Sequence, residues 1–109
     1  MRKTFTAQEF YDYLQEFESI CAYAGENHMV VSATVSPKDL DVYQIGNEYL
    51  FEGNVMKKRR GTRAGVFSIC AEKFDCEIEV RENTERHRFE VVTFFVDGKQ
   101  TQLKLSLTV

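Results

Sequence analysis

The sequence predicts an α+β fold in which an N-terminal helix packs on a curved antiparallel meander of about six strands. Apolar residues recur at helical spacing only near the N-terminus, over residues 7–24. Everything afterwards consists of short β-branched and aromatic segments separated by turn residues, a pattern typical of antiparallel strands. No linker, repeat or low-complexity segment interrupts the 109 residues, so we expect a single domain spanning 1–109.

The expected helix has clear start and stop signals. Thr6 and Glu9 have the spacing of a capping box, and Phe5 and Phe10 have the spacing of a hydrophobic staple. Gly25 is a natural C-terminal stop. One face of the helix is apolar, and its members are Phe10, Tyr13, Leu14, Phe17, Ile20, Cys21 and Ala24.

Four acidic residues lie along the expected helix: Glu9, Asp12, Glu16 and Glu18. The ordinary interpretation is a solvated face opposite the apolar one. The alternative is an acidic docking surface for a partner.

The strands follow in order, and the expected ranges are 29–35, 40–45, 48–51, 65–71, 73–81, 86–96 and 99–109. Pro37 ends the first of them, because proline cannot donate to a strand ladder. Gly46-Asn47 and Asp97-Gly98 are two-residue hairpin signals. Strict alternation over 73–81 predicts a half-buried strand with one wet face.

Composition excludes several classes of protein. Apolar residues make up 43% of the chain and aromatic residues 13%, which argues against intrinsic disorder. No segment approaches the roughly 18 consecutive apolar residues of a membrane span. The basic N-terminal stretch is not followed by the apolar run of a secretory signal, so we expect a cytoplasmic protein without membrane contact.

The residues that usually carry chemistry are sparse. Three cysteines, Cys21, Cys70 and Cys76, do not make a disulfide framework, so we expect free thiols, with a Cys70–Cys76 bridge as the alternative. His28 and His87 lack metal-ligand spacing to another His or Cys. No phosphate-binding glycine motif is present. We therefore expect no enzymatic activity, no cofactor and no metal site.

The strongest local signal is a cluster of basic residues in an acidic chain. The chain has a net charge of -3, yet five cations fall within seven positions: Lys57, Lys58, Arg59, Arg60 and Arg63. They lie in a glycine-containing interruption of the strand pattern, at residues 52–64. This cluster is the candidate site for nucleic acid or for a protein partner, and the ordinary alternative is a solvated loop without a binding function.

Three functions remain open at this point. The first is a small non-enzymatic module, an inhibitor or adaptor, that binds a protein through its acidic helix and basic loop. The second is nucleic-acid binding, with the basic residues on phosphates. The third is a cup for a small apolar ligand between helix and sheet. A meander also leaves two open edges, which leaves room for a homodimer.

Overall fold

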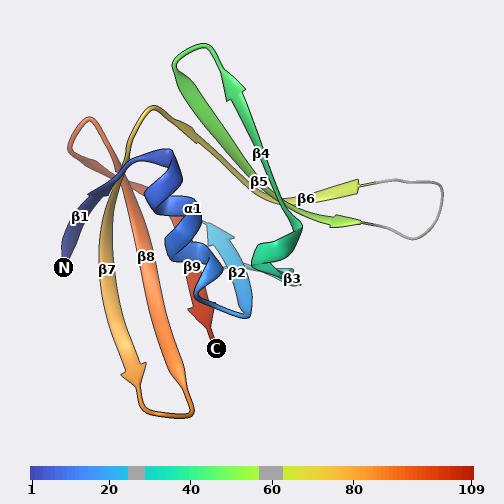
Figure 1. Ribbon diagram of the computed structural model, residues 1–109, viewed down its shortest axis with the longest axis vertical. Helices are drawn as coiled ribbons and strands as arrows, with labels where there is room; N and C mark the ends of the chain where they lie inside the picture. The colour runs from blue at the N-terminus through green and yellow to red at the C-terminus, as the bar shows by residue number, and fades with distance from the viewer. Residues whose placement is uncertain (25–28, 57–62) are drawn as a thin grey trace.

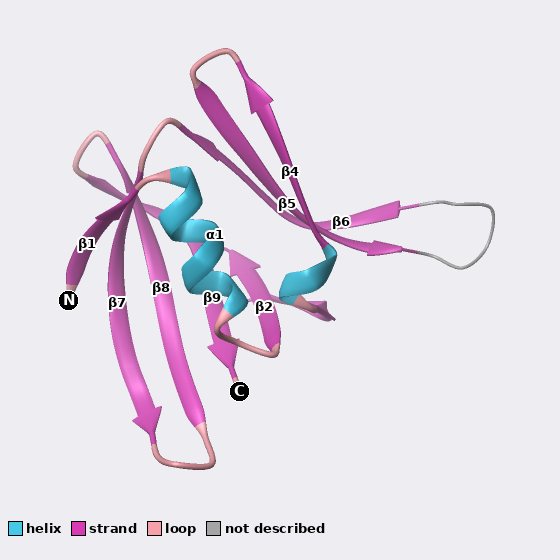
Figure 2. Ribbon diagram, in the orientation of Figure 1, coloured by secondary structure: helices cyan, strands magenta, loops and turns pink. Residues whose placement is uncertain are grey.

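The structure is a computed structural model that describes residues 1–24, 29–56 and 63–109. The strands are β1 (Arg2–Phe5), β2 (Ser19–Ala24), β3 (Met29–Val35), β4 (Leu40–Ile45), β5 (Glu48–Met56), β6 (Arg63–Ala71), β7 (Phe74–Asn83), β8 (Arg88–Val96) and β9 (Lys99–Thr108). The helices are α1 (Ala7–Gln15) and the short 3-10 helix η1 (Pro37–Asp39). Figure 2 shows how little of the described chain is helical.

The strands form two antiparallel sheets, which corrects the expectation of one meander. The larger sheet has the order β1-β7-β8-β9-β2-β3, and the smaller one has the order β4-β5-β6. Only β7, β8 and β9 follow one another as a meander within the larger sheet, and the N-terminal strands flank them on both sides. Helix α1 lies across one face of the larger sheet (Figure 1). The α+β class is therefore confirmed and the single meander is wrong.

The helix is shorter than expected, because residues 19–24 form β2 instead of its last two turns. Ile20 and Ala22 are fully buried and pair with Leu107 and Leu105 of β9. The spacing of Ile20 and Ala22 is compatible with a strand as well as with a helix. The backbone ladder that residues 19–23 form with β9 favours the strand. The strand β1, which pairs with β7, was not expected at all.

The local signals that were predicted for the helix start and the turns are confirmed. The Thr6 side chain accepts from the Glu9 backbone N–H, and the Glu9 carboxylate accepts from the Thr6 N–H at 2.9 Å. This contact with the Thr6 N–H is the main reason why the pKa of Glu9 lies below its usual value of 4.5. Asp97 and Gly98 both have positive φ, as a type I′ turn requires.

A single aromatic core joins α1 to both sheets, and Phe10 lies at its centre. Its ring stacks on Phe74 of the larger sheet with centroids 4.7 Å apart. It also meets Phe51 of the smaller sheet edge-on at 5.2 Å and Phe94 at 5.7 Å. Aromatic pairs at these separations are favourable beyond the area that they bury. Phe10 therefore holds the two sheets and the helix together.

The smaller sheet extends further than the sequence pattern indicated. We expected a strand over residues 48–51, but β5 runs on to Met56 through Gly53. Gly53 pairs with Phe67 of β6, and a Cβ atom on Gly53 would lie 2.3 Å from Phe67 Cε1. The glycine that looked like a strand breaker therefore makes room for an aromatic ring across the strands.

Candidate functional site: an aromatic cleft beside helix α1

A cleft of about 520 Å³ lies between the start of α1, the β4–β5 hairpin and the turn from β6 to β7. Its apolar walls come from Ala7 and Tyr11 of α1, and from Val42, Tyr49 and Phe51 of the smaller sheet. The volume falls within the range of about 300–1,000 Å³ that is typical of ligand pockets. It is larger than a second cleft of about 350 Å³, which lies beside the C-terminal end of α1.

The local structure explains why these side chains converge. Ala7 and Tyr11 are one helical turn apart, on a face beside the buried residues of α1. Tyr49 and Phe51 are two residues apart and share one face of β5. Val42 pairs with Phe51, so its side chain lies on that same face. Helix and sheet thus each contribute one small apolar stripe.

Polar groups surround this apolar floor. Thr6 and Gln8 line the cleft on the helix side, and Glu72 and Lys73 line it in the turn between β6 and β7. The Thr6 hydroxyl caps α1, and the Gln8 amide donates to Asp12 at 2.9 Å. The rim therefore carries both charges beside hydrogen-bonding side chains, an arrangement that suits a ligand with an apolar body and polar flanks.

The sequence left a cup between helix and sheet open as an alternative, but it identified none of the residues that line this cleft, although weak signals for them were present. Ala7 and Tyr11 recur at i and i+4 outside the main apolar face, and Tyr49 and Phe51 recur at i and i+2. Both patterns are also typical of ordinary core residues. Only the packing of the smaller sheet beside α1 shows that these residues line a cavity.

The predicted basic site lies mostly beyond what the structure describes. Lys57, Lys58, Arg59 and Arg60 are outside the described residues. Arg63 begins β6, and its backbone pairs with Met56 at the end of β5. The basic segment therefore connects the two strands of the β5–β6 hairpin, and its role stays a prediction.

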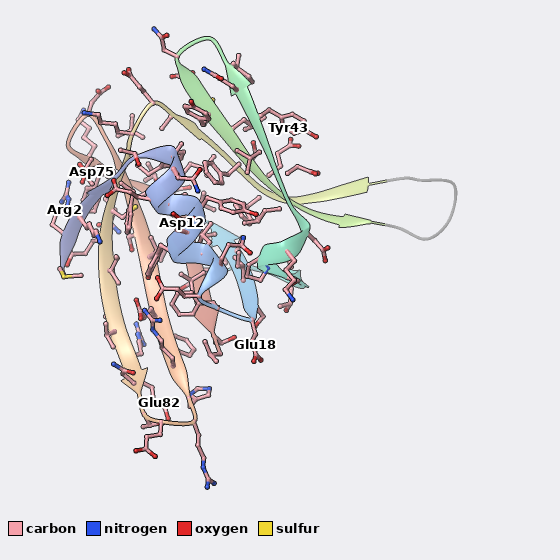
Figure 3. All side chains as sticks on the ribbon, viewed as in Figure 1. Arg2, Asp12, Glu18, Tyr43, Asp75 and Glu82 are labelled. Carbon is pink, nitrogen blue, oxygen red and sulfur yellow. The ribbon has the colours of Figure 1, made fainter. Side chains whose placement is uncertain are left out.

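The four acids do not form one helical face. Glu9 and Asp12 lie in α1, Glu16 is its C-terminal cap residue, and Glu18 follows the helix (Figure 3). Glu9 completes the capping box, and Glu16 binds Arg88 at 3.0 Å. Glu9 and Glu16 therefore take part in local contacts, and whether the acids form a solvated face or a docking surface stays a prediction.

A buried polar network fastens α1 to the larger sheet. Glu90 of β8 is only 4% exposed, and it accepts a hydrogen bond from the Tyr13 hydroxyl at 2.7 Å. The Arg88 guanidinium binds its second oxygen at 2.5 Å and lies 4.5 Å from the centre of the Phe17 ring. Burial, with the hydrogen bond to Glu90, raises the pKa of Tyr13. The stabilising effect of this shift is present below pH 10.0 and is lost at higher pH.

The three cysteines form no disulfide with one another in the described part of the chain, and their surroundings differ. Cys76 is fully buried, and its burial raises the pKa of the thiol to about 12. Cys70 is exposed and lies 3.5 Å from a Glu48 carboxylate oxygen. Partial desolvation and this carboxylate both raise the pKa of the Cys70 thiol.

We therefore expect alkylation to separate these two thiols. Because the thiolate is the nucleophile, iodoacetamide at pH 8 should label Cys70 in the folded protein and leave Cys76 unmodified. Peptide mass spectrometry with and without urea measures this, and the unfolded chain serves as the control in which both react. Equal labelling of both cysteines without urea would contradict the buried position of Cys76.

Other chemistry-bearing side chains do not assemble a site in the described part of the chain. His28 lies outside the described residues, and His87 Nδ1 is 2.9 Å from a Glu82 carboxylate oxygen at one end of the larger sheet. Over the residues described, no three His, Cys, Asp or Glu side chains gather as metal ligands would. Neither described helix is long and apolar enough to cross a membrane.

The chain was also compared with known proteins. No protein-family model, curated protein or solved structure matches it.

Proposed function

We propose that this protein is a non-catalytic binding module that holds an apolar side chain of a partner protein in the cleft beside α1. The observation that carries the proposal is the cleft itself, with its floor of Tyr11, Tyr49 and Phe51. Aromatic side chains that line a concave site commonly anchor a partner, because they offer a large contact area at a low cost in conformational entropy.

A polypeptide fits this cleft better than a fully apolar small molecule does. The rim of Gln8, Glu72 and Lys73 offers hydrogen bonds and both signs of charge to the polar backbone around an anchor. One wall, Val42, belongs to β4 at the edge of the smaller sheet, so a partner segment has a path out of the cleft. A small apolar ligand would make no use of that polar rim.

A library of random linear peptides tests the proposal. We expect the selected peptides to share one aromatic or aliphatic anchor residue. Ala7→Phe, which fills the cleft from the helix side, should weaken their binding about tenfold or more. Glu85→Phe, at an exposed position in the turn between β7 and β8, should leave binding unchanged. Isothermal titration calorimetry measures both affinities.

Other outcomes would favour the other functions. Peptides that bind the Ala7→Phe variant with the same affinity as the wild type would contradict the cleft as the binding site. Binding of 1-anilinonaphthalene-8-sulfonate that Ala7→Phe abolishes, with no peptide selected, would favour a small apolar ligand. The nucleic-acid alternative makes two other predictions. The logarithm of the affinity for nucleic acid should fall with the logarithm of the salt concentration at a slope of about -4. Replacement of Lys57 to Arg60 by alanine should abolish the binding.

A further inference from the structure

Strand β4 is an open sheet edge with apolar side chains on it. It ends the smaller sheet, and over the described residues no other strand lies on its far side. Val42, Tyr43 and Ile45 are 40%, 46% and 55% exposed. The strand reads LDVYQI, without the lysine, proline or bulge that usually protects an edge from pairing.

The other described edges are different. β1 has four residues, and two of them are the cations Arg2 and Lys3. Arg2 also binds Asp75 at 3.1 Å and lies over the Phe95 ring, as part of the neighbouring structure (Figure 3). β6, the other edge of the smaller sheet, and β3, the other edge of the larger sheet, contact each other. β4 is therefore the described edge best suited to accept a further strand.

The hairpin turn determines which backbone groups of β4 point outward. Ile45 and Glu48 flank a two-residue turn, so they form a hydrogen-bonded pair. Hydrogen-bonded and non-hydrogen-bonded pairs alternate along an antiparallel ladder, so Tyr43 bonds to β5 and its neighbours do not. Val42 and Gln44 consequently direct their N–H and C=O groups toward the open edge. The Leu40 N–H points elsewhere, because it donates to the Pro37 carbonyl oxygen.

From this geometry we infer that β4 pairs antiparallel with β4 of a second copy of the chain, which joins two smaller sheets into one sheet across a two-fold axis. In one register Val42 of each copy faces Gln44 of the other. That register uses all four outward groups of each strand in backbone hydrogen bonds. A two-fold interface is also the commonest form of self-association.

The side chains of β4 favour the same register. Tyr43 lies on the two-fold axis and meets Tyr43 of the second copy in a close, non-hydrogen-bonded pair. Ile45 of each copy lies diagonally beside that tyrosine pair. Asp41 is the one charged residue of β4, and four residues of strand, about 14 Å, separate the two copies of it. Tyr43 lies on the side of β4 away from α1, so this contact leaves the aromatic cleft open (Figure 3).

The oligomeric state in solution tests this inference. Sedimentation equilibrium should give twice the chain mass of 12.7 kDa. Gln44→Pro removes an outward N–H while it spares the ladder to β5, and it should raise the dimer dissociation constant at least tenfold. Val80→Lys, at an exposed apolar position of β7, is the matched control and should remain a dimer. Ala7→Phe should also remain a dimer, because the inference does not depend on the cleft.

A charge exchange at the axis tests the register even if Gln44→Pro fails to fold. Tyr43→Lys alone and Tyr43→Glu alone should each be monomeric, because like charges meet at the axis. An equimolar mixture of the two should restore a dimer that contains one of each. Three results would each overturn the inference. The first is a wild-type protein that stays monomeric at 100-fold the concentration used in the sedimentation experiment. The others are a Gln44→Pro variant that is still a dimer, and a mixture of the two Tyr43 variants that stays monomeric.

Discussion

Replacement of Phe10 by alanine is expected to lower the free energy of unfolding by about 3–5 kcal/mol. The Phe10 side chain is fully buried, and its ring contacts aromatic residues of both sheets. Alanine would leave a cavity where α1, β5 and β7 meet, and close-packed neighbours collapse into such a cavity only in part. Since a domain of this kind is stable by about 5–15 kcal/mol, this one change removes a large share of the total.

Urea unfolding followed by far-ultraviolet circular dichroism measures this effect, because the chain contains no tryptophan. Phe95→Ala is the control, since that ring is only half-buried on β8, and its loss should be clearly smaller. If Phe10→Ala does not fold, Phe10→Leu should show a smaller decrease in the same direction. A loss below about 1 kcal/mol for Phe10→Ala would contradict the central place of Phe10 in the core.

The second large effect is expected at Glu90. Glu90→Ala should lower the free energy of unfolding by about 3 kcal/mol, because removing one partner of a buried polar network leaves the others uncompensated. The Tyr13 hydroxyl would lose its acceptor, and Arg88 would keep only Glu16 as a carboxylate partner.

A double-mutant cycle separates the network from simple loss of volume. Tyr13→Phe combined with Glu90→Leu removes donor and acceptor together, so the pair should be less destabilising than the sum of the two single changes. The same urea titrations measure all three variants. Strictly additive losses would show that Tyr13 and Glu90 do not interact, and would contradict the hydrogen bond between them.

Most residues of the candidate site could not be predicted from the sequence. The basic cluster was found from charge alone, and it remains a prediction because four of its five members lie outside the described residues. A cup between helix and sheet was left open as an alternative, but its lining residues were not identified, since Tyr11, Tyr49 and Phe51 are indistinguishable from core residues until the sheets are placed. Whether an aromatic residue fills a core or lines a cavity depends on what packs opposite it, and periodicity carries no information about that.

The features that depend on neighbours within a few residues could be predicted from the order of the amino acids. The capping box of Thr6 and Glu9 started α1, and the Gly46-Asn47 and Asp97-Gly98 pairs formed two hairpin turns. The first turn set the register of its hairpin, whereas the register of the second shifts between Thr93 and Phe95. Side-chain alternation placed the strands β4, β7 and β9 to within two residues at either end. In each case the free energy comes from local hydrogen bonds, from backbone preference or from the period of the strand.

The features that join distant parts of the chain became clear only from the tertiary contacts. Residues 19–24 became a strand because β9 offered a ladder, although their spacing also suited a helix. The division into two sheets, the open edge at β4 and the cleft beside α1 depend on contacts between segments far apart in the sequence. The energy of such contacts depends on which partner strand is present, and no local pattern specifies that partner.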